Sequence, residues 1–553
     1  MPPRPARRPR ANHESRPAAS RRLPATSRRR GTAAGAIAAG HPLTARVGAD
    51  VLAAGGNAFD ACVAAAFASW VVESPLAGPG GGGFLLARPA DGRGDALYDF
   101  FVTVPGAERR WTPRPMAELA VDFADGGTSQ PFRVGASSCA VPGTAAGLEA
   151  VHRRYATRPW RSLLEPAVRL ARDGFELTPA QGYLHAILDP ILRREPEGRR
   201  VYSAGDGAAL TGERLRLPDL ADTLERLADE GAAALSCGEL AGRIARHIRE
   251  QGGALTAADL ASYRVVRRRP VRARFRDTEY VSNPPPSSGG LLIAYGLRLL
   301  DELGSAPRAG SVEAISALAE VMGEQARARE RSFARDLYRG GLPRRLLADD
   351  AVGAAVARIG SGGVAAREAR TAGGTTHVSV VDRDGNAASL SASLGSGSGV
   401  VVPGTGIHLN NMLGEYDLAP GAWLRVGERL TSMMAPSIVV HDGRPALVVG
   451  SAGSARLRGA IMQVVVNVVD HGLDAAHAVA APRVHLDGSQ LHCEGGHERA
   501  SLAEVAAGGF EVVRWRGRNL FFGGAAVVEV TPEGTLRAAG DPRRGGHGIV
   551  VDG

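Results

Sequence analysis

Two neighbouring segments show the alternation of hydrophobic and polar positions that is typical of half-buried strands. In residues 375–381, Val378 and Val380 alternate with polar neighbours, and residues 387–394 alternate in the same way. The sequence Asp-Arg-Asp-Gly-Asn at 382–386 lies between them and is typical of a tight turn. The two segments are therefore predicted to pair as an antiparallel hairpin.

Helical spacing dominates the start of the chain. In residues 41–52, Leu43, Val47 and Val51 fall on one face, and a Gly-Gly pair follows. Residues 59–72 are apolar on nearly all sides, which predicts a buried helix. These two segments are expected to supply much of the early core.

Strands and helices alternate in the remainder. Residues 144–270 have mainly helical spacing and are interpreted as scaffold, whereas 437–440 and 446–449 are strand-like. A glycine-rich turn at 450–454 then precedes an amphipathic helix that contains Ile461. A strand, a turn and a helix start in this order aim backbone N–H groups at one point, where they can hold an oxyanion during acyl transfer. An ordinary tight turn is the alternative.

Charge is distributed unevenly along the chain. The formal net charge is +9 over 553 residues, but residues 1–30 hold ten arginines and one glutamate, so the body is neutral. This tail mixes Pro, Ser, Ala and Arg, and it is predicted to be a disordered extension rather than a nucleic-acid-binding element. No secretory-type stretch lies near the start and no 18-residue apolar run occurs, so a cytoplasmic protein without a membrane span is expected.

Residue content excludes several chemistries. All 66 basic residues are arginine, which rules out a lysine Schiff base, a Ser–Lys dyad and a Walker-type phosphate loop. The GxGxxG-like run at 78–83 lies between a predicted helix and a predicted strand, the reverse of the order in a dinucleotide site. The four cysteines lack CxxC spacing, and His492 and His497 are five residues apart around a Gly-Gly pair, unlike HExxH. No metal or organic cofactor is predicted.

The candidate chemistry lies where the first hairpin strand begins, at Gly-Gly-Thr-Thr, residues 373–376. If the bond between Gly374 and Thr375 is cut, Thr375 carries a free α-amine beside its hydroxyl, a general base and a nucleophile in one residue. The hairpin register places Ser393 opposite Thr375, within hydrogen-bonding reach unless a bulge shifts the pairing. The alternative is that both are ordinary strand residues.

A series of short motifs extends this interpretation along the chain. They are residues 41–42, 55–58, 80–84, 141–144, 284–290, 375–386, 403–407 and 409–415. In this order they cover nearly everything after residue 30, and they resemble the gamma-glutamyltranspeptidase family. The members of that family are N-terminal-nucleophile hydrolases that cut themselves before a threonine.

The resemblance implies a catalytic set. Thr375 takes the place of the nucleophile after cleavage between Gly374 and Thr375, and Ser393 that of a hydroxyl residue which supports it. Gly453 and Ser454 match the pair whose backbone amides form the oxyanion hole. The family usually has glycine at the second of these positions, but a backbone donor survives the change.

The resemblance also implies substrate contacts, of which some are retained. Thr431 and Ser432 match two adjacent hydroxyl residues that bind the α-carboxylate of the substrate, and Glu415 matches an acidic residue that holds its α-amine.

Other substrate contacts are missing. Family members that process glutathione carry an arginine where this chain has Phe101, in the sequence Asp-Phe-Phe-Val. Met412 replaces a glutamine, and a contacting asparagine aligns near Gly395. We expect Phe101 and Met412 to present apolar surface to the substrate, so the glutamyl-recognition apparatus is depleted while the catalytic apparatus is kept.

The resemblance implies an α+β fold, the four-layer αββα sandwich of N-terminal-nucleophile hydrolases, in which segments 31–374 and 375–553 stay associated after self-cleavage. The resemblance implies a zymogen that becomes a gamma-glutamyltransferase or glutathione-hydrolase-like enzyme. It would act on a small-molecule amide or peptide and pass the acyl group to water or an amine. The alternatives are an acylase for a non-glutamyl acyl amide and an uncut, inactive binding protein.

Overall fold

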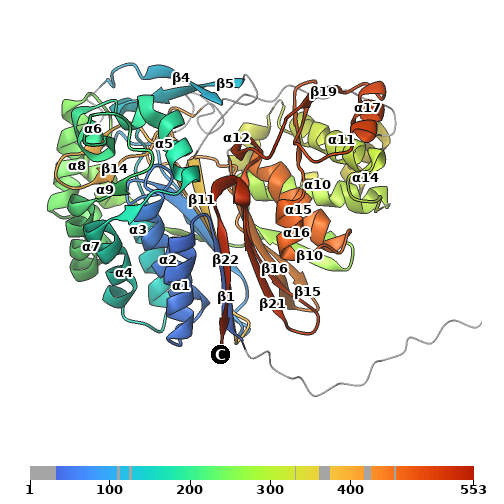
Figure 1. The fold of residues 1–553 in the computed structure, drawn as a ribbon, viewed down its shortest axis with the longest axis horizontal. Helices are drawn as coiled ribbons and strands as arrows, with labels where there is room; N and C mark the ends of the chain where they lie inside the picture. Colours follow the sequence, from blue (N-terminus) through green and yellow to red (C-terminus); the bar gives the residue numbers. More distant parts are fainter. Residues whose placement is uncertain are drawn as a thin grey trace, which may run out of the picture.

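Two β-sheets lie face to face at the centre of the molecule, with helices on both outer sides (Figure 1). The computed structural model describes residues 33–108, 112–123, 128–304, 306–330, 332–359, 374–415, 425–453 and 456–553. The predicted tail at 1–30 lies outside the described residues. The predicted αββα sandwich is confirmed.

The seven-stranded sheet has the order β22-β1-β11-β12-β2-β3-β8, and every neighbouring pair is antiparallel. Its strands are β1 (Ala33–Ala39), β2 (Gly82–Arg88), β3 (Ala96–Phe100), β8 (Val266–Arg268), β11 (Gly374–Asp382), β12 (Ala387–Gly395) and β22 (His547–Asp552).

The six-stranded sheet has the order β21-β20-β16-β15-β10-β9. Its strands are β9 (Val271–Phe275), β10 (Thr278–Ser282), β15 (Ser437–His441), β16 (Arg444–Ala452), β20 (Gly524–Val530) and β21 (Leu536–Gly540). Strands from both sides of Thr375 contribute to both sheets, so the two chain segments share one core.

Helices cover both outer faces (Figure 1). The layer on the seven-stranded sheet contains α1 (Pro42–Ala53), α2 (Ala58–Val72), α3 (Thr144–Tyr155), α4 (Trp160–Asp173), α5 (Pro179–Leu192), α6 (Pro196–Tyr202), α7 (Pro218–Glu230), α8 (Glu239–Glu250) and α9 (Ala257–Ser262). The other contains α10 (Gly289–Leu303), α11 (Val312–Ala328), α12 (Phe333–Arg339), α13 (Leu342–Leu346), α14 (Asp349–Ile359), α15 (Leu457–Val469), α16 (Ala475–Ala480) and α17 (Arg499–Ala507).

Short elements complete the fold. They are the strand pairs β4 (Ala117–Phe123) with β5 (Thr128–Val134), β6 (Phe175–Glu176) with β7 (Arg214–Leu215) and β13 (Val401–Val402) with β14 (Ile407–His408), the small sheet β17 (Val484–Asp487), β18 (Gln490–Cys493) and β19 (Glu511–Arg514), and the 3-10 turns η1 (Ala136–Ser138), η2 (Gly231–Leu235), η4 (Leu520–Phe522) and η5 (Pro542–Arg544).

The side-chain alternation of β11 connects two hydrophobic layers. Val378 and Val380 point into the cluster under α1 and α2, whereas Val381 points into the cluster between the sheets. A third cluster fills the space between the six-stranded sheet and α10, α11 and α15. Successive strand residues face opposite sides, and both faces of β11 are covered by a hydrophobic cluster. Every residue of β11 is therefore buried.

The predicted early helices are confirmed as α1 and α2. Every residue of α2 is buried, and the helix begins with a capping box in which Asn57 and Asp60 satisfy each other's backbone N–H groups. The predicted hairpin is also confirmed: β11 and β12 pair from Val381 opposite Ala387 back to Thr376.

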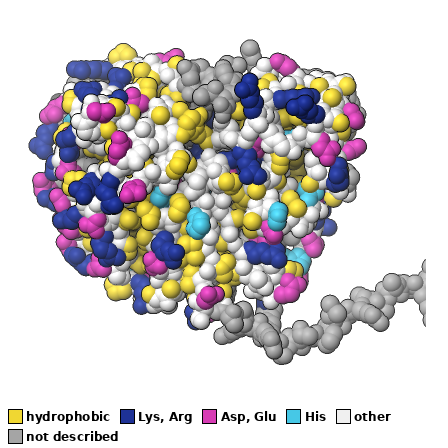
Figure 2. All heavy atoms as spheres, in the orientation of Figure 1, with side chains coloured by type: hydrophobic (Ala, Val, Ile, Leu, Met, Phe, Trp, Pro, Cys, Tyr) yellow, Lys and Arg dark blue, Asp and Glu magenta, His cyan; other side chains and the backbone are white. Residues whose placement is uncertain are grey.

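The surface agrees with a neutral body. On the face shown in Figure 2, arginine and acidic side chains are interspersed over the helical layers. Exposed pairs such as Arg226 with Glu239, 2.7 Å apart, are typical of it. None of the described helices combines the length and the hydrophobicity that a membrane crossing requires.

Candidate active site

Thr375 lies at the start of β11, between the two sheets, and is 4% exposed. Its hydroxyl donates to the Ser393 hydroxyl across an Oγ1–Oγ distance of 3.4 Å. The register shifts at this point, because Thr376 pairs with Ala392 while Gly374 pairs with Gly395. Thr375 is therefore within hydrogen-bonding reach of Ser393, but the predicted directly opposed pair is interrupted by a bulge at this strand end.

Ser393 also contacts the peptide bond that precedes Thr375. Its hydroxyl donates to the Gly374 carbonyl oxygen, and it accepts from the Gly395 N–H at 2.8 Å. A Cβ atom on Gly374 would lie 2.5 Å from the Gly395 oxygen and from a Leu76 methyl group. Close approach of backbone thus requires glycine here, and the serine polarises the carbonyl that self-cleavage would attack.

A buried carboxyl lies on the opposite face of β11. The Thr376 hydroxyl donates to Glu73 Oε2 at 2.6 Å, and the Thr44 hydroxyl donates to Glu73 Oε1 at 2.8 Å. Burial raises the pKa of Glu73, and the two hydroxyl donors and Arg544 oppose this effect. The sequence reasoning missed Glu73, although a carboxyl directly after a mainly apolar helix was a signal.

A guanidinium group contacts the backbone of the nucleophile. Arg544, at the end of η5, donates from Nη1 to the Thr375 carbonyl oxygen at 3.4 Å. Its methylene groups cover Gly524, where an added Cβ would lie 2.4 Å from Arg544 Cδ. Burial lowers the pKa of Arg544 to about 10, so it remains protonated at neutral pH. The sequence carried no local signal for this contact.

The predicted strand–turn–helix order for an oxyanion site is present. β16 ends at Ala452, Gly453 follows with φ +134°, and α15 begins four residues later at Leu457. A Cβ on Gly453 would lie 3.9 Å from Arg544 Nη2, so Gly453 and Thr375 are both neighbours of the same guanidinium. Ser454, predicted as the second backbone donor, lies outside the described residues.

The predicted carboxylate-binding hydroxyls precede β15. Thr431 is 5% exposed, and in the described part of the chain its Oγ1 has no hydrogen-bond partner. The Ser432 hydroxyl accepts from the Met434 N–H at 3.1 Å. Of the two, Thr431 therefore keeps an unused hydroxyl that a ligand could engage.

Phe101 and Met412 both lie in the hydrophobic cluster between the sheets. Phe101 is fully buried and stacks on Phe84, with ring centroids 5.4 Å apart, and Met412 is 1% exposed. Neither lines the cavity beside Thr375. The predicted substrate-facing apolar surface is thus, in this structure, part of the closed core.

Arg429 does not replace the missing arginine. Its guanidinium donates to the carbonyl oxygens of Phe101 and Arg264 and to the Tyr263 hydroxyl, and its Nε lies 3.3 Å from Asp99 Oδ1. These contacts tie the 429–432 segment to the end of β3. The arginine is therefore committed to holding the scaffold.

The position of the missing asparagine is closed by packing. Gly395 has φ +72°, and a Cβ there would lie 2.0 Å from Asn411 Oδ1 and 2.6 Å from Glu415 Oε1. Glu415, predicted to hold an α-amine, is 8% exposed and lies beside this glycine. No side chain fits at residue 395 without displacing both neighbours.

A cavity of about 50 Å³ lies beside Thr375 and Thr376. One wall is formed by His41, whose Nδ1 accepts from the Leu43 N–H, so that Nε2 carries the proton donated to Gln181 Oε1 at 3.0 Å. Burial lowers the pKa of His41 to about 4, which keeps it neutral at physiological pH.

Among the described residues, no set of three His, Cys, Asp or Glu side chains could hold a metal ion.

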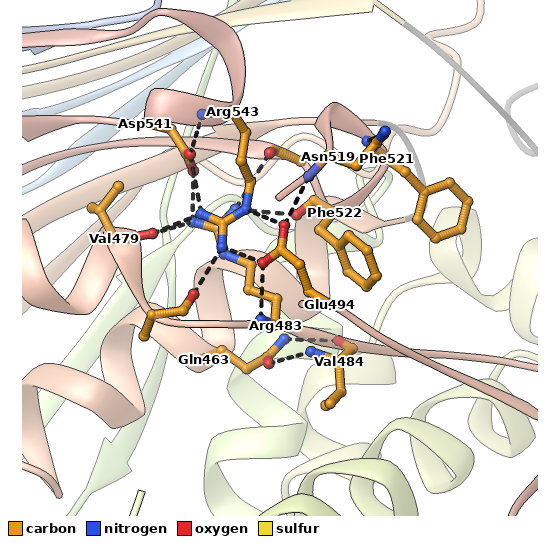
Figure 3. A network of polar contacts seen from close by, with 12 residues as sticks. Gln463, Val479, Arg483, Val484, Glu494, Asn519, Phe521, Phe522, Asp541 and Arg543 are labelled. Atoms are coloured by element: carbon orange, nitrogen blue, oxygen red, sulfur yellow. Dashed lines mark hydrogen bonds and ion pairs between the residues drawn. The ribbon is translucent and has the colours of Figure 1, made fainter. Parts of the chain in front are cut away.

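A buried ionic network is centred on Arg543 (Figure 3), the residue before Arg544 in the chain. Arg543 binds Glu494 with Nε at 2.7 Å and Asp541 with Nη1 at 3.1 Å, and Arg483 binds Asp541 at 2.6 Å. These four side chains are at most 2% exposed. Although burial alone would raise it, the two guanidinium groups hold the pKa of Asp541 below its usual value.

Glu494→Gln is expected to lower the free energy of unfolding by about 3–5 kcal/mol, because it removes one of the two carboxylates that balance the buried guanidinium groups of Arg543 and Arg483. Chemical denaturation followed by fluorescence would show a lower midpoint. Glu239→Gln, which breaks the exposed pair with Arg226, is the matched control and should leave the midpoint unchanged. Equal midpoints for both variants would show that the buried network does not stabilise the fold.

A threonine at the start of a central strand between two facing sheets, with a supporting hydroxyl and a glycine turn beside it, defines an N-terminal-nucleophile hydrolase. Residues 44–551 match the family described as gamma-glutamyltranspeptidase. The chain belongs to this family.

Relatives of two kinds resemble the chain. It is 33% identical over 542 residues to the acylase ACY 1 proenzyme of Pseudomonas sp. (strain SE83), covering 94% of each chain. It is 31% identical over 539 residues to the glutathione hydrolase proenzyme of Escherichia coli (strain K12), covering 92% of this chain and 90% of that one. The crystal structure of cephalosporin acylase from Bacillus halodurans matches with a TM-score of 0.80 at 25% identity, over 94% of this chain and 96% of that chain.

Proposed function

We propose that the chain is a self-processing acyl transferase or amidohydrolase that cuts itself before Thr375 and then uses this threonine as its nucleophile. The observation that carries the proposal is the position of Ser393, whose hydroxyl contacts both the Thr375 hydroxyl and the Gly374 carbonyl oxygen. The attacking oxygen, the bond to be broken and a donor for the developing oxyanion therefore lie together at one strand end.

Self-cleavage begins when the Thr375 oxygen attacks the Gly374 carbonyl carbon. The C–N bond breaks, the nitrogen takes up a proton to become the free α-amine, and an ester joins Gly374 to the threonine oxygen. Water then hydrolyses this ester, which frees the hydroxyl and leaves segments of 374 and 179 residues. The segments stay associated because their strands are neighbours in both sheets.

Turnover repeats the same chemistry on an external amide. The Thr375 hydroxyl attacks the acyl carbonyl while the α-amine accepts its proton, the amine product leaves, and the acyl group remains as an ester on the threonine. Water or an amine acceptor then takes the acyl group. The two relatives are named as a hydrolase and an acylase, and both names support action on amide bonds.

The acyl donor is proposed to differ from an ordinary γ-glutamyl compound. Phe101 is buried against Phe84, Arg429 is held by scaffold contacts, and Arg456 donates to the Phe521 carbonyl while its guanidinium lies over that ring. These three observations support the loss of the arginine contact to the substrate α-carboxylate. The proposed donor is therefore an acyl group without a free α-amino acid.

We expect the cleaved protein to hydrolyse a butyryl p-nitroanilide, which lacks both the α-carboxylate and the α-amine of the γ-glutamyl group, with a kcat/KM at least one-tenth of that for the γ-glutamyl p-nitroanilide. Each charge-assisted hydrogen bond contributes about 1.5–3 kcal/mol, so loss of the arginine contact removes roughly ten- to a hundredfold of the γ-glutamyl preference. Release of nitroaniline gives both values directly.

A kcat/KM more than tenfold higher for the γ-glutamyl anilide would contradict the proposed acyl specificity. The protein would then have the ordinary specificity of the family. If the cleaved protein releases nitroaniline from no acyl anilide, the enzymatic proposal fails in favour of a binding homologue.

A further inference from the structure

The backbone nitrogen of Thr375 opens toward the cavity rather than toward the hairpin partner. Within an antiparallel strand, the N–H and C=O of one residue point to the same neighbour, and successive residues alternate. The Asp382 N–H donates toward β12, and the Arg383 N–H donates to β1, so odd-numbered residues of β11 face β1. The Thr375 carbonyl follows this rule, because it accepts from Arg544 on that side.

No β1 residue covers Thr375 there. The pairing of β1 with β11 ends with Ala39 opposite Val378, and the chain turns away at Gly40. The cavity beside Thr375 occupies the space beyond. After cleavage, the new α-amine would therefore lie in this cavity, on the same side as Arg544.

The histidines that line this cavity carry no charge at neutral pH. Burial lowers the pKa of His41 and of His185 to about 4, and that of His377 to about 3. His41 lies at the start of α1, His185 on α5 and His377 on β11 itself. The charge around the amine therefore comes from the lining acids and arginines.

Those remaining charges differ in how they are engaged. Arg543 and Asp541 neutralise each other within the buried ionic network, and Glu73 receives two hydroxyl donors on the helix side of β11. Arg544 donates to the Thr375 carbonyl, and its buried Nε has no hydrogen-bond partner in the described part of the chain. The positive charge of Arg544 is therefore directed at the nucleophile and lowers the pKa of its α-amine. An ionised Glu73 would raise that pKa.

We propose that Arg544 is a positioning residue that keeps the α-amine of cleaved Thr375 unprotonated at neutral pH, so that the amine can accept the proton of its own hydroxyl. A guanidinium bound to the carbonyl of the same residue disfavours a second positive charge on that residue's nitrogen. At a separation of about 5 Å, such a pair lowers the pKa of an amine by roughly one to two pH units. The inference rests on the proposed function, because the α-amine exists only after cleavage.

The test is the pH dependence of kcat/KM for an acyl p-nitroanilide, measured with the cleaved enzyme. At low pH, kcat/KM rises as the amine loses its proton, and this rise is the acid limb of the profile. Removing the guanidinium raises the pKa of the amine, so in Arg544→Gln the acid limb is expected to move to higher pH by about one unit or more. Arg544→Lys should return it toward the wild-type position. Arg246→Gln, which removes the same charge from an exposed site on α8, should leave the limb in place. A purely structural role would lower kcat/KM at every pH without moving the limb.

A second readout does not depend on activity. Cyanate carbamylates only the neutral form of an amine, so the rate at which it modifies the N-terminal peptide of the small segment, followed by mass spectrometry, reports the pKa of the Thr375 α-amine. An upward shift of the midpoint in Arg544→Gln would support the inference even if no anilide were hydrolysed. An unmoved limb and midpoint in cleaved enzyme would overturn this inference alone. An uncut chain would overturn it together with the proposed function.

Discussion

Thr375→Ala is expected to leave the chain uncut at 553 residues and to reduce acyl transfer by a factor of about 10⁴ or more. Both effects have one cause, because the variant lacks the oxygen that attacks the Gly374 carbonyl and later the substrate. Denaturing electrophoresis of the wild type should show segments of 374 and 179 residues, and N-terminal sequencing of the smaller one should begin at Thr375.

Thr375→Ser is the matched control, since it keeps a hydroxyl at the same backbone position. We expect it to be cut and active, at lower rates than the wild type. A wild-type protein that stays one chain with full activity would refute the N-terminal-nucleophile mechanism. Cleavage of Thr375→Ala at the same bond would show that an outside protease makes the cut.

Ser393→Ala is expected to slow self-cleavage by about 10²–10³, the usual effect of removing one oxyanion donor. The serine hydroxyl donates to the Gly374 carbonyl oxygen in the uncut chain, so its loss removes stabilisation where negative charge develops. A time course of cleavage in freshly purified protein, followed by electrophoresis, gives the rate.

Ser391→Ala provides the comparison for this experiment. Ser391 lies on the same strand and face as Ser393, but its hydroxyl contacts His377 Nδ1 at 2.8 Å instead of the Gly374 carbonyl. Cleavage should be slower in Ser393→Ala than in Ser391→Ala at equal fold stability. Equal slowing would mean that both act by loosening the strand pair, which would contradict the oxyanion role.

Local pattern predicted the elements well because the interactions that form them are local in sequence. The alternation in 375–381 and 387–394, with a turn between them, was sufficient for the hairpin and its register, because a one-residue slip would reverse every buried side chain. The continuous apolar run at 59–72 predicted α2, whose residues are all buried. The family resemblance then supplied the layer arrangement, which local pattern alone does not contain.

Substrate recognition was only partly predictable. The sequence shows that Phe101 stands where an arginine would be expected. It does not show that the aromatic ring of Phe101 stacks on Phe84 inside the core. The same holds for Gly395, where the clash of any side chain with Asn411 appears only once the strand and the following loop are packed together. Such exclusions depend on distances between segments, which a single sequence does not specify.

The sequence by itself determined the hairpin, the nearness of Ser393 to Thr375 and the glycine before the nucleophile, because these depend on strand period and on one short turn. The tertiary structure alone decided what surrounds the nucleophile. Glu73 reaches Thr376 across 303 residues of sequence and Arg544 reaches Thr375 across 169. Their charges act on the site only because α2 and η5 both end beside the same open end of β11. No local propensity encodes the approach of these distant segments.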